Sequence, residues 1–349
     1  MLDSNGGIMN NSTENYYLDN TRISNSNIGW FLNKGPAFLH SMLNGEASGE
    51  NTPQLALGSM IHEYLLQPEE FHKHYLVWDK SRPSSAQQEK FCRALIATTE
   101  IEPNKVVLSA YKEAYSTTGR SDEKMLSEGL KIASTLKDYI DFLKQKDGRI
   151  LISPYQASQL MKISENIWKH KKAKTLLQTP CEVRKAYGEA PFTEEGKLQS
   201  VLYHEFHINW EFMNVNCKSL LDSLYLDFEN KKCILMDLKT TAKINKFEES
   251  MKDYDYLRQL CFYTKAIEWY LENELNEEPG EWLFEWYIIA IDTISDNSIH
   301  VFGFTEDQVY SRLDTIEQAL KDIKWHQDNN LWTYRREYYE GDGTEQLNL

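Results

Sequence analysis

Cysteines are scarce in this sequence, and their spacing excludes the usual structural roles of the thiol. The 349 residues contain five of them, at positions 92, 181, 217, 233 and 261, and no two form a C-x-x-C pair. The sequence therefore supports neither a zinc knuckle nor a disulfide framework. Reduced thiols in a cytoplasmic protein are the simplest interpretation.

Long apolar runs and a secretory leader are also missing. The first thirty residues are polar and rich in Asn and Ser, and they lack the positively charged start and apolar stretch of a signal peptide. No later run approaches eighteen apolar residues. We therefore expect a soluble, internal protein with no membrane partner.

Positive charge is in deficit, with 38 Lys and Arg against 53 Asp and Glu and a formal net charge of −15. This balance argues against non-specific coating of nucleic acid, because phosphate binding depends on cationic surface. It does not exclude nucleic acid as a substrate. A site that binds a divalent metal needs clustered carboxylates, and a local basic groove can coexist with a negative remainder.

The glycine-rich phosphate motifs G-x-G-x-x-G and G-x-x-x-x-G-K-[ST] are absent, and the order of elements does not suit a Rossmann repeat. The pattern is mainly helical to about residue 178 and then alternates in short runs between 181 and 237, as a strand meander does. A helix over 253–275, strands over 282–292 and 298–304, and a last helix from Thr305 follow. We expect flexible tails at 1–20 and 336–349, a mainly helical part at 21–180 and an α/β core at 181–335.

Several helix starts carry recognisable caps. Ser24 or Asn25 can cap a helix that ends before Gly35, and Thr52 followed by Pro53 suits the start of the next helix. Thr305 and Gln308 form the T-x-x-Q pattern of a capping box.

The stretch "CILMDLKTT", residues 233–241, places an acid and a lysine at the end of an apparent buried strand. Residues two apart on a strand point to the same face, so Asp237 and Lys239 lie side by side. A hairpin would bring Asp222 toward Asp237, and two adjacent carboxylates suit Mg²⁺ or Mn²⁺. The alternative interpretation is a surface hairpin with an ion pair of little energetic value.

Three further residues favour a site. Gln259 and Tyr263 are four apart on a predicted helix and share one face. His62 lies on an otherwise apolar helix, where a neutral imidazole can serve as a metal ligand. Taken alone, such a histidine is more often a satisfied core residue.

These segments together resemble the PD-(D/E)XK nuclease superfamily, in particular the exonuclease VIII (RecE)-like phage and prophage enzymes. The resemblance rests on "GSMIHEYLLQPEEF", "EFHINWEFMNVNCKSLLD" and "ILMDLKTTAKINKFEESMKDYDYLRQLCFYTKAIEW", with the closing strand and helix, and runs from "RISNSNIGWFLNKGPAFL" to "NNLW". It implies an α/β (α+β) fold: a restriction-endonuclease-like core with a central mixed β-sheet flanked by helices, and an added N-terminal helical region.

The resemblance also implies roles for individual residues. The metal ligands would be His62, Asp222, Asp237 and the backbone carbonyl of Leu238. The lysine of the D-x-K motif would be Lys239, and Gln259 and Tyr263 would form the Q-x-x-x-Y helix. Glu205 falls where related sequences often have a glutamate, and the alternative for it is an ordinary strand-edge residue.

Two departures from the family pattern stand out. Leu220-Leu221 replaces the proline expected before the first aspartate, Asp222. No cysteine follows Cys261, so the set that holds an iron–sulfur cluster in the helicase-nuclease and CRISPR-associated relatives is missing. This favours the exonuclease VIII-like branch without an iron–sulfur cluster.

By this resemblance we expect a Mg²⁺- or Mn²⁺-dependent exodeoxyribonuclease that acts on double-stranded DNA ends, 5′ to 3′, in phage-type recombination or DNA repair. A ring-shaped homo-oligomer, a single-strand annealing protein as partner, and a bacterial or phage-infected cytoplasm are implied on the same grounds. The alternatives are an endonuclease or single-strand nuclease of the same fold, and a non-catalytic DNA-binding phage protein.

Weaker candidates for DNA contact lie outside these motifs. Lys169, Lys171 and Lys172 form part of a basic helix that can follow a phosphate backbone, although a solvated helix face explains them equally well. Thr240 either contacts a phosphate or simply ends its strand.

Overall fold

The computed structural model describes residues 13–49, 52–177 and 200–344. The chain divides into two compact units. We call residues 1–68 and 160–349 the sheet unit and residues 69–159 the helical unit. Each is described separately below.

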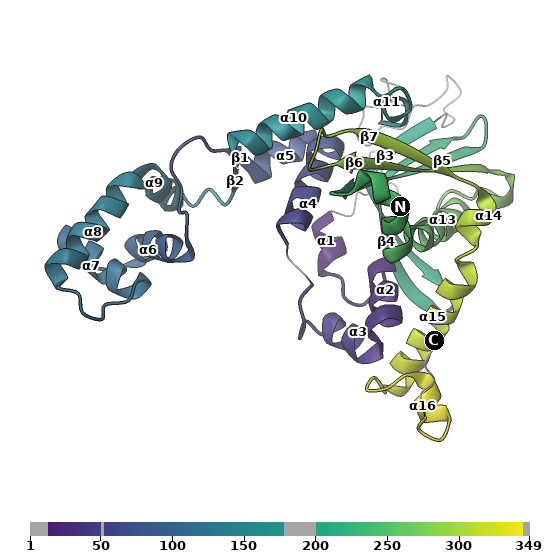
Figure 1. The fold of residues 1–349 in the computed structure, drawn as a ribbon. Helices are drawn as coiled ribbons and strands as arrows, with labels where there is room; N and C mark the ends of the chain where they lie inside the picture. Colours follow the sequence, from purple (N-terminus) through teal and green to yellow (C-terminus); the bar gives the residue numbers. More distant parts are fainter. Residues whose placement is uncertain (1–12, 50–51, 178–199, 345–349) are drawn as a thin grey trace, which may run out of the picture. The chain divides into compact units, whose positions relative to one another are not determined.

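The sheet unit is built on a five-stranded mixed β-sheet in which the strands follow their sequence order (Figure 1). The strands are β3 (Ser200–Phe212), β4 (Val215–Asp227), β5 (Lys232–Thr241), β6 (Leu283–Asp292) and β7 (Ile299–Phe304). All neighbours are antiparallel except β5 and β6, which are parallel. A parallel pair needs a long crossover, and the segment that contains α13 (Tyr256–Asn273) supplies it.

Helices flank this sheet (Figure 1). Besides α13 they are α1 (Thr13–Leu18), α2 (Asn25–Lys34), α3 (Pro36–Leu43), α4 (Pro53–Leu66), α11 (Lys171–Leu177), α12 (Phe247–Asp253), α14 (Glu306–Tyr310), α15 (Leu313–Asn329) and α16 (Arg336–Glu340). Helix α13 packs on β3 and β4, while α2 and α15 pack on α13. Helix α4 instead contacts β4 and β5.

The main core lies where α13 meets the sheet. Leu260, Phe262 and Ile267 of the helix and Leu224 and Leu235 of the strands are almost completely buried there. The 3.6-residue period of the helix and the two-residue period of the strands bring these apolar side chains to one layer. The predicted mixed sheet flanked by helices is therefore confirmed.

The helical unit has its own core and a two-stranded parallel sheet, β1 (Tyr75–Val77) with β2 (Ile150–Ile152). Its helices are α6 (Ala86–Ala97), α7 (Pro103–Ala114), α8 (Asp122–Thr135) and α9 (Lys137–Gln145). Phe91, Tyr111 and Met125 form the centre of this core. The unit boundaries fall at α5 (Pro68–His74) and within α10 (Pro154–Lys169).

The predicted helix caps are present. Ser24 accepts from the Asn27 amide in a capping box, and the Thr52 hydroxyl accepts from the Leu55 amide, with Pro53 at the first helical position. Thr305 and Gln308 also form the expected capping box. These caps satisfy amides that have no partner within the helix.

Some elements differ from the sequence analysis. The last helix breaks into α14 and α15 near Ser311, whose hydroxyl donates to the Gln308 carbonyl at 2.7 Å and competes with the helical pattern. The helix expected from residue 253 begins at Tyr256, after Asp255 adopts a left-handed φ of 48°.

Helices also form in both segments expected as tails. Residues 1–12 and 345–349 lie outside the described residues, but α1 and α16 form within the remaining parts of the expected tails. The buried Lys218 donates to the carbonyls of Tyr16 and Asp19 at 2.6 and 2.5 Å. Such a contact joins residues about two hundred positions apart, so the local pattern cannot show it.

The division into units also differs from the boundary expected near residue 180. Helix α4, expected in the helical part, packs on β4 and β5 and so belongs to the sheet unit. The start of the expected core, residues 181–199, lies outside the described residues.

Candidate active site

Three carboxylates form a row across three neighbouring strands. In the β3–β4 register, Glu205 and Asp222 lie opposite each other, between the pairs His204–Ser223 and Phe206–Leu221. The β4–β5 pairing ends at Ser223–Met236, and Asp222 and Asp237 are the next residues on the two strands, close enough for the Asp222 charge to raise the pKa of Asp237. Directly opposite side chains share one face of a sheet. The hairpin prediction that brings Asp222 toward Asp237 therefore agrees with the register, which adds Glu205 to the row.

The pleat of the first two strands shifts by one residue at this row. Glu205 has a φ of 49°, in the left-handed region that residues other than glycine rarely adopt within a strand. On the N-terminal side of Glu205, the odd-numbered residues Val201 and Tyr203 of β3 pack on the core. On its C-terminal side, the even-numbered residues Phe206, Ile208 and Trp210 do. On β4 the change is from Cys217 and Leu221 to Leu224 and Leu226. Strain of this kind is concentrated at functional sites.

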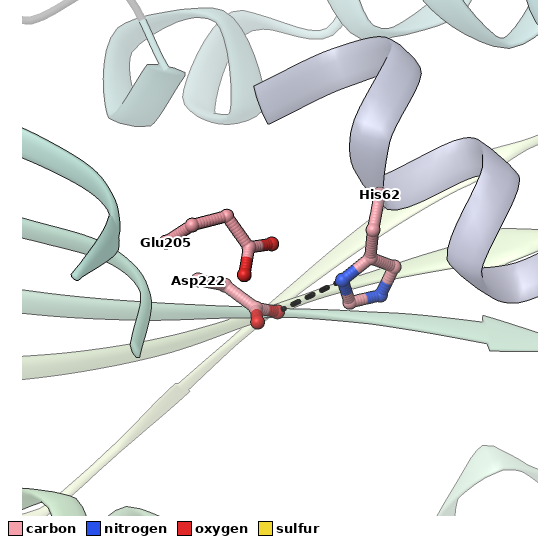
Figure 2. A group of neighbouring side chains, drawn as sticks. All are labelled: His62, Glu205 and Asp222. Carbon is pink, nitrogen blue, oxygen red and sulfur yellow. Dashed lines mark ion pairs between the residues drawn. The ribbon is translucent and has the colours of Figure 1, made fainter. Parts of the chain in front are cut away.

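His62 of α4 lies against the row, as Figure 2 shows. Its Nδ1 is 3.5 Å from Asp222 Oδ2, which also accepts from the Leu238 backbone amide at 2.6 Å. A ring nitrogen of His62 and one carboxylate oxygen each of Glu205 and Asp222 all lie within 4.8 Å of one another. The helix and two strands thus bring together an imidazole and two carboxylates (Figure 2).

Asp237 and Lys239 form the second half of the site. Lys239 Nζ is 2.6 Å from Asp237 Oδ2, and Asp237 is only 1% exposed. Asp237 Oδ2 is thus paired with the Lys239 ammonium, whereas Oδ1 is buried without a hydrogen-bond partner among the described residues. Unsatisfied buried carboxylate oxygens are costly and therefore point to a missing ligand.

The electrostatics of the row follow from burial and from like charge. Burial, followed by the neighbouring Asp222 and Asp237, raises the pKa of Glu205 to about 8. Burial raises the pKa of Asp237 to about 6 even though Lys239 opposes the shift, and it also raises the pKa of Asp222. A carboxyl group keeps such a raised pKa when it is buried near other acids and too little positive charge lies nearby to stabilise its ionised form.

The two nitrogen groups respond in opposite directions. Burial, with help from the Lys239 charge, lowers the pKa of His62 to about 4, so its imidazole is neutral near pH 7 and able to bind metal. Burial by itself would lower the pKa of Lys239, but Asp237 and Asp222 outweigh it and the pKa is raised. Lys239 is therefore an ammonium at neutral pH.

A divalent cation fits these residues. Carboxylate oxygens are the ligands that Mg²⁺ and Mn²⁺ prefer, and a neutral imidazole is compatible with Mn²⁺. The unpartnered Oδ1 of Asp237 and the raised pKa of each of the three acids indicate a deficit of positive charge that such an ion would fill. The predicted role of the Leu238 carbonyl stays a prediction, although its amide does orient Asp222.

The predicted Q-x-x-x-Y pair is formed on α13. Gln259 Nε2 donates to the Tyr263 hydroxyl at 3.0 Å. Tyr263 is 7% exposed, and burial raises the pKa of its phenol far above the usual value. The charges of Asp237 and Asp222 contribute to that shift, which places the phenol near the acidic row.

The weaker candidates have partners of their own. Lys169 pairs with Glu165 at 3.4 Å, and Lys172 donates to the Tyr287 hydroxyl at 2.9 Å while lying 4.0 Å from the centre of that ring. Thr240 packs beside α4, where a Cβ added to Gly58 would lie 3.1 Å from its Oγ1. These contacts give Lys172 and Thr240 structural roles, and DNA contact by Lys169, Lys171, Lys172 or Thr240 stays a prediction.

Two parts of the site lie beyond what the sequence pattern alone predicts. The position of Glu205 follows from a two-residue turn at Met213-Asn214, both with positive φ, which fixes the register of the β3–β4 hairpin. The Asn at this turn is the signal that would have paired Glu205 with Asp222. The ring centre of Tyr256 is 5.0 Å from Lys239 Nζ, and no motif in the sequence indicates this contact.

Comparison with known families agrees with this geometry. Residues 191–340 match the model of a family described as a PDDEXK-like domain of unknown function (DUF3799). This part of the chain is similar to a PDDEXK-like domain. The matched range contains Glu205, Asp222, Asp237, Lys239 and the Gln259–Tyr263 pair, and the resemblance inferred from the sequence is confirmed at this level. A nuclease-like function is supported accordingly.

Other comparisons are more distant. A crystal structure of a candidate exonuclease from Eubacterium rectale is 13% identical, with a TM-score of 0.47, and the match covers 93% of this chain and 90% of that one. No curated protein matches the sequence significantly. Among the residues that the structure describes, no helix has the length and apolar character needed to cross a bilayer.

Proposed function

We propose that this protein is a divalent-metal-dependent exonuclease of the exonuclease VIII-like type, which hydrolyses phosphodiester bonds from the ends of double-stranded DNA. The observation that carries the proposal is the row of Glu205, Asp222 and Asp237 with Lys239 paired to its last member. A structural ion pair needs one acid and one base. One buried and two half-buried acids, a neutral imidazole and one lysine are instead suited to a cation and a phosphate.

Each residue has a role that its surroundings support. His62, Asp222, Asp237 and Glu205 would hold Mg²⁺ or Mn²⁺. When bound, the ion supplies charge that stabilises the phosphoryl group during hydrolysis. The raised pKa of Lys239 suits it to orient the attacking water and to neutralise developing negative charge rather than to remove a proton.

The Gln259–Tyr263 pair would position the substrate strand beside these groups. Their mutual hydrogen bond fixes both side chains before substrate arrives, which reduces the entropy lost on binding. The 5′-to-3′ direction, the ring-shaped homo-oligomer, the annealing partner and a role in recombination rest on the resemblance to the exonuclease VIII-like enzymes.

The proposal is tested by degradation of a linear duplex labelled at its 5′ or 3′ end, beside a closed circular duplex, in Mg²⁺ and in EDTA. We expect loss of the linear DNA only, in Mg²⁺ only, with the 5′ label released first. The Asp222→Asn variant should be inactive while retaining the wild-type circular dichroism spectrum.

The other outcomes separate the alternatives. Cutting of the circle would make the protein an endonuclease, and selective loss of single-stranded DNA would make it a single-strand nuclease. Binding of DNA without cleavage of any substrate in Mg²⁺ or Mn²⁺ would overturn the enzymatic proposal in favour of a DNA-binding protein.

A further inference from the structure

A column of stacked aromatic rings passes the buried Phe247 of the sheet unit and reaches solvent at Tyr254. Phe302 and Phe247 are 5.1 Å apart between ring centres at 10°, and Phe247 is 6.0 Å from Tyr256 at 29°. Tyr256 is in turn 5.7 Å from Tyr254 at 18°. The inner ring of Phe247 is 3% exposed, whereas Tyr254 at the outer end is 66% exposed. The column thus ends in a flat aromatic face that is open to solvent.

This column passes directly beside the acidic row. The centre of the Tyr256 ring lies 5.0 Å from Lys239 Nζ, which itself is 2.6 Å from Asp237. Tyr254 is therefore one stacking step beyond the ring that contacts the lysine. Successive nucleotides are separated by a comparable distance, so a base next to a phosphate at Lys239 is within reach of Tyr254.

The backbone that carries the two tyrosines is fixed in an uncommon conformation. Asp255 between them has a φ of 48°, and its carboxylate accepts from Arg312 Nε at 2.8 Å and lies 3.8 Å from Arg258 Nη1. The Tyr254 amide donates to the Ser250 carbonyl at 3.1 Å. A strained turn that is held from several sides presents a preorganised surface, which binds a flat ligand with little loss of entropy.

The negative charge of the sheet unit makes an uncharged binding surface for nucleic acid useful. This unit has 24 Lys and Arg against 40 Asp and Glu, so its overall field repels a polyanion. Stacking of an aromatic ring on a nucleobase is independent of charge and of sequence, because every base has a π face. It would therefore supply affinity that the surface charge does not.

We infer that Tyr254 is a base-stacking subsite, which holds an unpaired or terminal nucleobase next to the phosphate at Asp237 and Lys239. Bases inside a duplex have both faces covered by their neighbours, whereas the base at a DNA end has one face free. The inference rests on the proposed nuclease function and adds to it a determinant for recognition of DNA ends.

The test uses duplexes with 2-aminopurine at the terminal position and phosphorothioate linkages that resist cleavage, in Mg²⁺. Wild type and Tyr254→Phe should quench the 2-aminopurine fluorescence on binding. Tyr254→Ala and Tyr254→Leu should lose the quenching and bind roughly 5- to 100-fold more weakly, since a base–aromatic stack is lost. Leucine keeps an apolar cover over Tyr256, so this variant separates stacking from packing.

Tyr155→Ala is the matched control, because Tyr155 is 76% exposed on α10 and has no ring partner among the described residues. It should bind and quench as wild type does. On cleavable DNA, Tyr254→Ala should raise KM with little change in kcat.

Two results would overturn the inference and can be told apart. If wild type cleaves DNA ends and Tyr254→Ala binds and quenches normally, the subsite is wrong and the nuclease proposal stands. If wild type neither binds nor cleaves any DNA, the proposed function fails and the subsite with it.

Discussion

The two units of this protein differ in how their acidic side chains are compensated by positive charge. The helical unit contains a groove of about 680 Å³ between α6, α9 and the turn that follows α9. Its acids are paired: Glu89 with Arg93 at 2.6 Å, and Asp147 with Arg149 through two hydrogen bonds of 2.7 and 2.6 Å. Arg149 lowers the pKa of Asp147. In the sheet unit the pKa of Glu205 is instead raised to about 8, and Asp237 Oδ1 is buried without a hydrogen bond from any residue that the structure describes, although Lys239 pairs with Oδ2.

The difference shows which charges point to chemistry. Exposed ion pairs are solvated, contribute little energy and need no ligand. Buried carboxylates that face one another cost stability unless something positive joins them. The count of charges is nearly balanced in the helical unit, with 14 Lys and Arg against 13 Asp and Glu, whereas the sheet unit has the large acidic excess. A metal-dependent site belongs where charge is buried and uncompensated.

The largest contrast between the units is expected in catalysis. Lys239→Ala should lower kcat by roughly 10²- to 10³-fold, because it removes the ammonium that lies beside the acidic row. Lys146→Ala in the groove of the helical unit is the matched change. Steady-state rates on a linear duplex should be unchanged in this control, and an equal loss in both variants would show that the site of hydrolysis is misassigned.

A smaller effect should follow from moving His62 without changing it. Gly58→Ala adds a Cβ that would lie 3.1 Å from Thr240 Oγ1, so either the Thr240 side chain or α4 must shift by a few tenths of an ångström. Because small displacements of a catalytic group are costly, we expect kcat to fall on the order of 10-fold. Thr240→Ala removes the clashing atom, so the double variant should recover most of the lost rate. If the double variant does not recover the lost rate, the contact between residue 58 and Thr240 is not the cause of the lower kcat.

The dependence of stability on pH should have opposite signs in the two units. The folded pKa of Glu205, about 8, lies above the value in an unfolded chain, so the folded protein holds a proton that the unfolded one has released. The stability of the metal-free protein should therefore fall as the pH rises from about 5 to 8, with a limiting slope for Glu205 of roughly 1.4 kcal/mol for each pH unit. Asp147, whose pKa is lowered, stabilises above its unfolded pKa and loses this contribution only as the pH falls.

Urea unfolding in EDTA at pH 6 and pH 8 measures this effect. Glu205→Gln should flatten the profile between these values, and Asp147→Asn should leave it unchanged. If the free energy of unfolding of wild type does not change between pH 6 and pH 8, the pKa of Glu205 is not raised, and nearby positive charge must offset the acidic row.

The smallest effect is expected from an exposed pair. Arg93→Ala breaks the contact with Glu89 and should cost only about 0.2–1 kcal/mol, because both groups remain accessible to water. Urea unfolding at low and high salt should show that the difference shrinks as salt screens the pair. A salt-independent loss well above this range would indicate that Arg93 contributes through packing instead.

Much of this site could be predicted because its signals are local. The shared face of Asp237 and Lys239 follows from the two-residue period of a strand, and the helix caps follow from the residue types at the helix starts. The opposite placement of Asp222 and Asp237 needed only a hairpin. The structure agrees with each of these.

The remaining features depend on contacts between distant segments. The one-residue shift of the pleat at Glu205 becomes visible only when both strands are paired. The contact of Tyr256 with Lys239 joins a helix to a strand, and the anchoring of α1 by Lys218 joins residues about two hundred apart. The boundaries of the helical unit likewise follow from packing of α4 on the sheet, which composition does not encode.

The most direct test of the account is a titration of the metal-free protein with Mn²⁺ at pH 8, followed by the electron paramagnetic resonance signal of the free ion. We predict that wild type binds Mn²⁺, that Asp222→Asn in the acidic row loses this binding, and that Asp147→Asn in the helical unit retains it. Equal Mn²⁺ binding by wild type and Asp222→Asn, or none by wild type, would contradict the claim that the buried carboxylates form a metal site.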